Sequence, residues 1–192
     1  MQYIQKHFTS TLEVKQSKFI AHLIPYELYE TTLEQLKVEH PKARHFVTAF
    51  RYLNEYDQVV EHSSDDGEPK GTSGKPSLMV LQGQELINIA VIVVRYFGGT
   101  KLGTGGLVRA YSDAVNQVIN EAELSPYEKE FTQKVSVDYA DIRLLEYECE
   151  TADIKIVDKN FTTDAEYILK ASQENLKTLL EKLKRVVKVL SS

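Results

Sequence analysis

The period of the hydrophobic positions changes several times along the chain, and each change predicts a different element. Residues 11–24 alternate between polar and apolar side chains and then become almost continuously apolar, which predicts a pair of strands. Residues 87–95 are apolar at odd and even positions alike, as in a strand buried on both faces of a sheet. After Gly103, apolar side chains recur every three or four residues to about Glu123, which predicts a long amphipathic helix. Further elements are expected as a helix at 26–38, strands at 45–52 and 58–61, and a short helix at 76–83.

The last third of the chain forms a second, complete pattern. Ser125 and Pro126 indicate a break after the long helix. The segments that follow are expected at 135–139, 141–152, 154–157, 163–171, 175–185 and 186–190, with a turn at 158–160. Their order is strand, helix, strand, strand, helix, strand, which is the βαββαβ order of a ferredoxin-like unit. We therefore predict an α+β protein of two domains, residues 1–127 and 128–192.

Composition and charge narrow the classes of function. The chain has 23 Lys and Arg against 28 Asp and Glu, a net charge of −5, which argues against a protein that coats nucleic acid through bulk positive charge. Cys149 is the one cysteine, so neither an intrachain disulfide nor a multi-cysteine zinc site is possible. The N-terminus does not follow the pattern of a signal peptide, and the longest apolar run is too short to span a bilayer. We expect a cytoplasmic protein with no membrane partner.

The glycine-rich segment between the buried strand and the long helix is the main candidate for a binding site. Five glycines in nine residues permit positive φ and close backbone approach, and the following helix offers unpaired N–H groups and its positive dipole end. The segment matches neither the Walker loop nor the dinucleotide fingerprint. We predict a site for phosphate or carboxylate; the alternative is that the glycines only allow tight packing of helix on strand. The residues assigned to this site are Gly98, Gly99, Lys101, Gly103, Thr104, Gly105, Gly106 and Arg109.

The first glycine-rich loop along the chain precedes the short helix. Thr72, Ser73 and Lys75 offer two hydroxyls and a positive charge just before Pro76, which suits the first turn of a helix. A catalytic Ser73 would need the pattern G-x-S-x-G, and Lys75 occupies the place of the last glycine. We therefore interpret the loop as a second anion-binding segment.

An acidic turn lies just before this first loop. Asp65, Asp66 and Glu68 follow His62 closely, but their spacing does not meet the EF-hand pattern, so a solvated turn is favoured over a metal site. The three carboxylates are kept as secondary candidates for a catalytic base or metal ligand. The other histidines show no ligand spacing, and no metal or cofactor is predicted; these histidines are His7, His22, His40 and His45.

Two blocks of sequence resemble the YigZ/IMPACT family. They are SDDGEPKGTSGKP at 64–76 and VVRYFGGTKLGTGGLVRAYSDAV at 93–115, with VKQSKFIA at 14–21 similar to the family's N-terminal strand. The resemblance is strong over residues 1 to about 125, and the rest of the chain looks like the second domain of bacterial members.

The resemblance implies a fold for each domain and a class of function. The first domain is expected to resemble the second domain of a small-subunit ribosomal protein, and the second the last domain of elongation factor G. Eukaryotic members regulate translation under amino-acid starvation, whereas the family name implies no reaction. Three departures from the family stand out: Ser73 replaces a usual Ala, His45-Phe46-Val47 replaces a frequent His-Asn-Cys, and Lys18 replaces Arg. The resemblance therefore supports neither a catalytic serine nor a cysteine mechanism here.

Three functions remain open from the sequence. The leading hypothesis is a non-enzymatic binding protein that recognises RNA, the ribosome or a translation-associated protein through the glycine-rich loops. The second is an enzyme, a hydrolase or phosphotransferase, acting on a small anion held by the same loops. The third is a protein–protein adaptor in which the loops are structural. The sequence does not specify the ligand or the oligomeric state.

Overall fold

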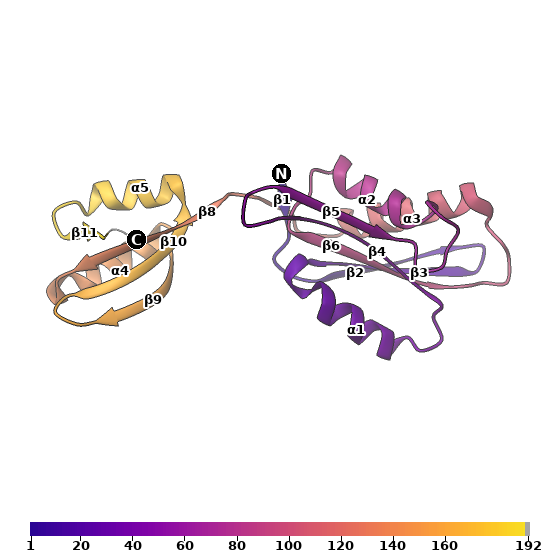
Figure 1. Cartoon of the computed structure of the whole chain (residues 1–192), viewed down its shortest axis with the longest axis horizontal. Helices are drawn as coiled ribbons and strands as arrows, with labels where there is room; N and C mark the ends of the chain where they lie inside the picture. The colour runs from indigo at the N-terminus through magenta and orange to yellow at the C-terminus, as the bar shows by residue number, and fades with distance from the viewer. Residues whose placement is uncertain (191–192) are drawn as a thin grey trace. The chain divides into compact units, whose positions relative to one another are not determined.

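The computed structural model describes residues 1–190 and divides the chain into two compact units, Met1–Tyr127 and Glu128–Ser192 (Figure 1). Each unit has its own sheet and its own buried apolar cluster. The predicted α+β architecture with two domains is confirmed. Among residues 1–190, no helix has both the length and the apolar character needed to cross a bilayer.

The N-terminal domain is built on a five-stranded antiparallel sheet in the order β2-β3-β6-β4-β5. The strands are β2 (Phe8–Val14), β3 (Ser17–Pro25), β4 (His45–Leu53), β5 (Val59–Ser64) and β6 (Ile89–Tyr96). Strand β6 lies in the middle of the sheet and is buried from Ile89 to Arg95. Its unbroken run of Ile, Ala and Val side chains fits this position, because a central strand covered on both faces has no polar side.

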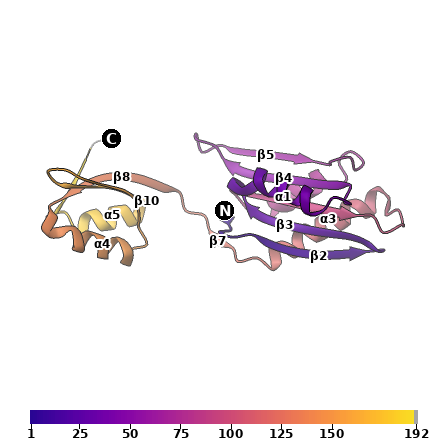
Figure 2. The same ribbon diagram turned by 90° about the horizontal axis from the view of Figure 1, so that it is seen from below.

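Helices cover both faces of this sheet. Helix α1 (Tyr29–Glu39) lies on one face, and α2 (Gly74–Gly83) and α3 (Gly103–Asn120) lie on the other (Figures 1 and 2). The larger core lies under α2 and α3, with the fully buried Tyr111 of α3 against Phe19 of β3. The long amphipathic helix is thus confirmed. The expected break at Ser125–Pro126 is instead strand β7, which pairs with β1 (Gln2–Tyr3) and so belongs to this domain.

The C-terminal domain has the predicted βαββαβ order. Its antiparallel sheet runs β11-β8-β10-β9, and its two helices pack on this sheet around one core that includes Cys149. The elements are β8 (Glu130–Val137), α4 (Ile142–Thr151), β9 (Lys155–Phe161), β10 (Ala165–Ser172), α5 (Gln173–Lys182) and β11 (Val187–Val189).

One predicted turn in this domain is wrong. Residues 158–160 lie inside β9, where they pair with β10, and the chain reverses instead around Thr162, whose N–H donates to the Asp164 carbonyl at 3.1 Å. Cross-strand pairing thus overrides the turn preference of Asp and Asn, since pairing with a half-buried strand contributes more than local turn propensity. The finer likenesses to a ribosomal-protein domain and to the last domain of elongation factor G stay predictions.

Candidate anion-binding groove

The first glycine-rich loop already holds an anion, and that anion is the chain's own Asp65. One carboxylate oxygen of Asp65 accepts hydrogen bonds from the N–H of Ser73 at 3.2 Å, the Ser73 hydroxyl at 2.7 Å and the N–H of Gly74 at 2.8 Å. The other oxygen accepts from the N–H of Gly71 at 2.7 Å. Burial acts to raise the pKa of Asp65, but these four hydrogen bonds outweigh it and hold the pKa below its ordinary value. The carboxylate therefore takes the place that we expected an external ligand to occupy at the start of α2.

The hydroxyls predicted to bind a ligand in this loop are engaged within the protein. Ser73 is fully buried, and the buried Thr72 donates its hydroxyl to the Pro69 carbonyl at 2.6 Å. Lys75 is exposed, so it is the one member of the predicted set in this loop that reaches solvent. The prediction of a second external anion site at Thr72 and Ser73 is corrected accordingly.

The acidic turn is structural rather than a solvated loop. Glu68 is 8% exposed and forms an ion pair with the equally buried Arg95 at 2.5 Å, while Tyr111 donates its hydroxyl to the same carboxylate oxygen at 2.8 Å. Asp66 accepts a hydrogen bond from the N–H of Phe46 at 2.6 Å. All three acidic candidates therefore have structural partners, and the interpretation of this segment as a solvated turn is wrong for Glu68.

The second glycine-rich loop, residues 98–106, contains four glycines for which the fold itself gives a reason. A Cβ atom on Gly98 would lie 2.0 Å from the carbonyl carbon of Gln16, and the Gly98 N–H donates to the Ser17 hydroxyl at 3.1 Å. Gly99 and Gly103 adopt φ values of 86° and 73°, which other residues adopt at a cost. A Cβ on Gly106 would come within 3.0 Å of the Leu102 Cβ. The alternative that the glycines are purely structural is therefore enough to explain these four.

Neither a close contact nor a positive φ within residues 1–190 explains the glycine at position 105. It lies in the first turn of α3 with an ordinary backbone conformation, and a Cβ built on it would meet no atom within 4 Å. Glycine at a helical position is less favourable than alanine by about 0.5–1 kcal/mol. A glycine that costs stability and faces open space points to close approach of something outside the chain.

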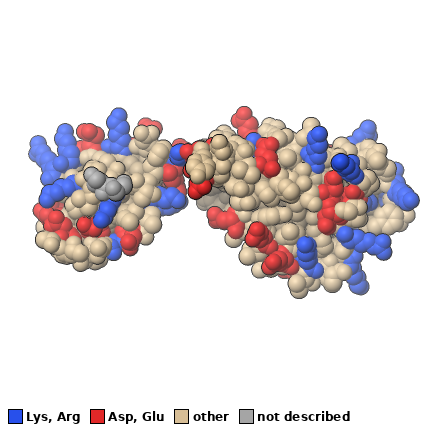
Figure 3. Space-filling model, in the orientation of Figure 1, with Lys and Arg blue, Asp and Glu red and all other residues tan. Residues whose placement is uncertain are grey.

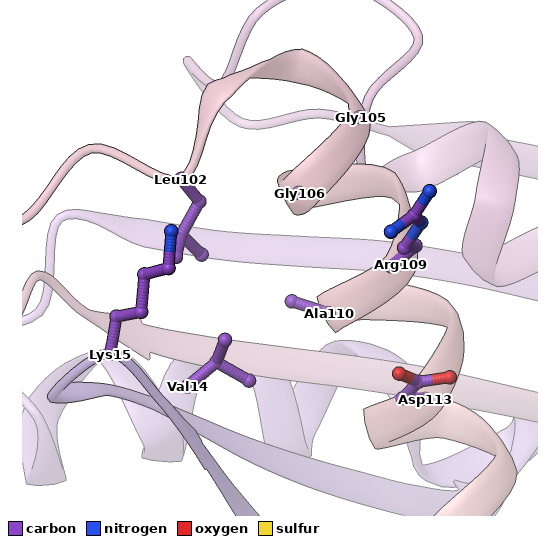
Figure 4. Close-up of a pocket in the computed structure, with 8 residues that line it drawn as sticks. All are labelled: Val14, Lys15, Leu102, Gly105, Gly106, Arg109, Ala110 and Asp113. Atoms are coloured by element: carbon purple, nitrogen blue, oxygen red, sulfur yellow. The ribbon is translucent and has the colours of Figure 1, made fainter.

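The space in front of Gly105 is a surface groove of about 460 Å³ between α3 and the turn that joins β2 to β3 (Figure 4). Gly105 and Gly106 form one wall, and the side chains of Lys15 and Arg109 flank the groove, with Asp113 one helical turn beyond Arg109. The lining is completed by Val14, Leu102 and Ala110. Lys15 and Arg109 thus place two cations at a groove that begins beside the start of α3, and Asp113 adds one carboxylate to its lining.

The start of α3 has no capping side chain. Leu102 occupies the N-cap position and makes no side-chain hydrogen bond to the first turn, whereas at α2 the Asp65 carboxylate satisfies the first amides. Within residues 1–190, no carboxylate lies in ion-pair contact with Lys15, Lys101 or Arg109. Lys and Arg side chains gather at the end of this domain where the β2–β3 turn and the loop before α3 lie (Figure 3). The groove lining therefore carries two cations and one carboxylate, on a chain with a net charge of −5.

Lys15 was missed from the sequence. Lys15 and Gln16 form a two-residue hairpin turn with φ of 47° and 65°, the pattern of a type I′ turn, although neither is a residue that favours it. The turn is held against the second loop by the close approach of Gly98. Lys15 and Gln16 form a polar pair between two predicted strands, and this pair could have indicated a hairpin turn. The local sequence does not indicate which loop that turn contacts.

The predicted site residues separate into four groups in the structure. Gly105, Gly106 and Arg109 line the groove, whereas Gly98 is engaged by the β2–β3 turn. Four further residues belong to the exposed loop and helix start beside the groove; they are Gly99, Lys101, Gly103 and Thr104. The first-loop residues do not line this groove.

Comparison with known proteins gives consistent matches over both domains. The family model described as the Impact N-terminal domain matches residues 15–119, and one described as a domain of unknown function, DUF1949, matches residues 135–186. An IMPACT family member of Haemophilus influenzae is 38% identical over 174 residues, which cover 89% of this chain and 84% of that protein. The IMPACT family member YigZ of Escherichia coli is 45% identical over 112 residues, covering 57% of this chain and 55% of that one. A crystal structure of a hypothetical protein is similar with a TM-score of 0.70 and 29% identity, covering 100% of this chain and 96% of the other.

Proposed function

Because this chain belongs to the IMPACT family, we propose that it is a translation-associated binding protein whose groove at the start of α3 holds a phosphate group of RNA. The family resemblance supports the link to translation, and the groove supports the chemistry of recognition. The proposal assigns no reaction to the protein.

The observation that carries this proposal is the unexplained glycine at position 105. An incoming phosphate oxygen needs a backbone without a Cβ if it is to reach the N–H groups of the first helical turn. Lys15 and Arg109 then lie on either side of such a group and neutralise its charge. Each of these features binds an oxyanion, and none of them reads a base.

A phosphate within a polymer fits better than a free small molecule. The groove lies at the surface beside exposed loop residues, so we expect it to take one phosphate of a longer chain. The charge elsewhere on the protein is mildly acidic, which limits binding to the few phosphates that reach the positive end. We therefore expect weak, salt-sensitive and largely sequence-independent association with single-stranded RNA or with exposed ribosomal RNA.

The direct test is the double substitution Lys101→Ala with Arg109→Ala, and separately Lys15→Ala. Fluorescence anisotropy with a labelled single-stranded RNA is measured over a range of salt concentrations, together with co-sedimentation with ribosomes at low salt. Each phosphate contact that is lost lowers the slope of log affinity against log salt by about 0.7 for a single strand. We expect weaker binding and a shallower slope for both variants.

The matched control is Lys37→Ala, which removes an exposed lysine from α1 on the opposite face of the sheet. It should bind as the unmodified protein does. Unchanged RNA affinity and co-sedimentation in the Lys101 and Arg109 double variant would contradict the proposal. Ribosome binding that survives nuclease treatment and the double substitution would favour a translation-linked protein as the partner.

A second candidate is an enzyme that acts on a small anion. Its support is the groove volume of about 460 Å³, which lies in the usual range for small-molecule sites, and the presence of Asp113 as a carboxylate at its edge. Since Asp65, Asp66 and Glu68 are engaged within the fold, Asp113 would have to serve as the base. A thermal-shift screen with nucleotides, phosphosugars and divalent ions separates the RNA-binding protein from the enzyme. A selective rise in melting temperature of several degrees with one of these compounds favours the enzyme.

A further inference from the structure

Four strands form the edges of the two larger sheets, and three of them are protected against pairing with another chain. Helix α3 packs along β2, and its Gln117 side chain donates to the Thr11 carbonyl at 3.3 Å. Strand β9 has a shifted register and carries Lys155 and Lys159, and β11 is only three residues long. Lysines, irregular registers, short strands and a covering helix are the means by which proteins block an exposed edge.

The fourth edge strand, β5, lacks these forms of protection. It is six residues long, pairs with β4 without a register shift, and contains no Lys, Arg or Pro. Figure 2 shows β5 along one margin of the N-terminal domain, and within residues 1–190 no strand pairs with its outer side. The side chains of Val59, Glu61 and His62 are exposed. Strand β5 is therefore open to pairing with another chain.

The pairing with β4 identifies the backbone groups of β5 that point outward. In an antiparallel pair, residues that bond to the facing strand alternate with residues whose N–H and carbonyl groups point away from it. The Asn54 N–H donates to the Gln58 carbonyl at 3.0 Å, and the bonded pairs continue from there at every second residue. By this alternation, the N–H and carbonyl groups of Val59, Glu61 and Ser63 point away from β4.

A cluster of aromatic rings lies beside this edge, on the α1 face of the sheet. The rings of Tyr26 and Tyr52 stack with their centroids 4.1 Å apart, and the exposed His62 ring of β5 stacks on Phe50 of β4 at 5.2 Å. We call this group the aromatic surface; its members are Tyr26, Tyr29, Phe50, Tyr52 and His62. Side chains of a strand paired with β5 alternate between the two faces, so every second one lies beside these rings.

The segments that build the aromatic surface are acidic. Residues 19–36 and 52–69, which contain β5 and most of the aromatic surface, include several Asp and Glu but no Lys or Arg. Arg51 of β4 points to the α2 face instead, where it pairs with Glu61 at 2.7 Å and donates to the Leu81 carbonyl at 3.3 Å. This charge repels a nucleic-acid backbone and attracts a cationic protein segment.

The tyrosine rings themselves are suited to Lys and Arg side chains. Burial raises the pKa of Tyr26, and the charge of Glu30 adds to this rise, which places the Glu30 carboxylate near the ring. Figure 3 shows acidic side chains gathered where α1 begins. The face of an aromatic ring attracts a cation, most often the guanidinium group of Arg. The rings and the nearby carboxylates therefore favour the same kind of occupant.

We propose that the outer side of β5 binds an extended, arginine-rich segment of a partner protein, which pairs with β5 as an additional strand of the sheet. Hydrogen bonds to the backbone of Val59, Glu61 and Ser63 hold the segment, and its Arg side chains on the α1 face lie on the aromatic surface. The sheet order places β5 at the opposite edge from β2, so this surface is separate from the groove beside the β2–β3 turn. The proposal therefore does not depend on RNA binding at that groove.

Fluorescence anisotropy with the full chain and a labelled peptide of alternating Arg and Val, as long as β5, tests the proposal. We expect saturable binding that weakens as salt is added, because the acidic side chains around the surface are exposed. A Glu–Val peptide should not bind. An Arg–Pro peptide keeps the charge but loses backbone donors, so it should bind about 10-fold more weakly or less. Hydrogen exchange at the amides of Val59, Glu61 and Ser63 should slow when the Arg–Val peptide is bound.

Two substitutions test the backbone and the charge separately. Ser63→Pro removes an outward N–H and keeps the pairing with β4, so it should fold and bind the Arg–Val peptide about 10-fold more weakly. Glu30→Lys reverses a charge at the exposed start of α1 and should weaken binding about 5-fold at low salt. Glu13→Lys is the matched control, because it makes the same change at an exposed position of β2, on the opposite edge of the sheet. It should leave the affinity unchanged.

Three results would overturn the proposal. The first is equal binding of the Arg–Val and Arg–Pro peptides, or an affinity that neither Ser63→Pro nor Glu30→Lys changes. The second is a dimer of the free protein in analytical ultracentrifugation that Ser63→Pro dissociates, which would assign the edge to a second copy of the chain. The third is loss of single-stranded RNA binding in Ser63→Pro, which would assign the edge to RNA.

Discussion

The two glycine-rich loops of the N-terminal domain are alike in composition, but only the first is bound by a carboxylate of the chain itself. Both precede a helix and both place amide groups at its start. In the first loop Asp65 accepts four hydrogen bonds and fills the space, whereas in the second no side chain caps the helix. The first helix start therefore binds a carboxylate of the chain itself, whereas anion binding at the second stays a proposal.

The availability of a nearby carboxylate separates the two loops. Asp65 precedes Ser73 by eight residues, near enough for the acidic turn to fold back onto the loop. No Asp or Glu occurs from residue 86 to residue 112, so no carboxylate close in sequence can accept hydrogen bonds from the amides of the second loop. Substitutions in the acidic turn, which carries Asp65 and the buried Glu68, and in the open second loop test this difference.

Glu68→Gln should have the largest effect, because it leaves the buried Arg95 guanidinium without its charge partner. Removing one partner of a buried ion pair costs about 3–5 kcal/mol. Arg95 is 6% exposed and its Nε has no hydrogen-bond partner within residues 1–190, so it has little to replace Glu68. Urea unfolding followed by circular dichroism measures the loss.

The double variant Glu68→Gln with Arg95→Met is the control for this prediction. Removing both charges should recover much of the lost stability, since the unpaired buried charge is gone. A single variant with the urea midpoint of the unmodified protein would show that the pair contributes nothing.

Gly98→Ala tests the contact that brings the β2–β3 turn to the open loop. The added Cβ would lie 2.0 Å from the Gln16 carbonyl carbon and 2.2 Å from the Ser17 nitrogen, both backbone atoms that cannot move independently. We expect a destabilisation of about 2–3 kcal/mol or more, together with loss of the groove. Differential scanning calorimetry and RNA binding are measured together; a variant that keeps both its melting temperature and its RNA affinity would refute this role.

Asp65→Asn breaks the internal anion site with little change in shape. Replacing the charge should cost about 1–3 kcal/mol at pH 7, the usual value of hydrogen bonds to a charged group. The folded-state pKa of Asp65 lies below its ordinary 3.8, so between these values the unfolded chain binds a proton that the folded chain does not. The contribution of Asp65 is therefore complete above about pH 4 and is lost as the pH falls through the folded-state pKa.

Urea unfolding of both proteins at pH 7 and at successively lower pH checks this expectation. The difference between the unmodified protein and Asp65→Asn should be constant from pH 7 to about pH 5 and should shrink below pH 4. Glu55→Gln, which changes an exposed carboxylate in the β4–β5 turn, serves as the control and should show neither effect.

Gly105→Ala should have the smallest effect on stability and the opposite sign. Alanine is the better helix former by about 0.5–1 kcal/mol, and its Cβ meets no atom of the protein. We expect a slightly higher melting temperature and weaker RNA binding. A gain in stability without any loss of RNA affinity would remove the reason for a ligand at this glycine.

Hydrophobic periodicity alone was enough to predict most of the elements. The doubly buried strand β6, the long helix α3 and the βαββαβ order of the second domain all follow from local patterns, because a side chain's period records which face of its own element is buried. The predicted turn at 158–160 failed where pairing with β10 outweighed local preference. The glycine-rich segment at 98–106 was likewise visible as a candidate from composition alone.

What the sequence by itself determined, then, is the series of elements and the presence of two potential anion loops. Tertiary structure decided which loop stays open, because that depends on whether Asp65 can reach the amides of Ser73 and Gly74. It also placed Lys15 across the groove from Arg109, and His7 beside His22, through a hairpin turn and a strand register. Contacts between residues far apart in the chain form only when the elements pack together, so the local sequence pattern does not predict them.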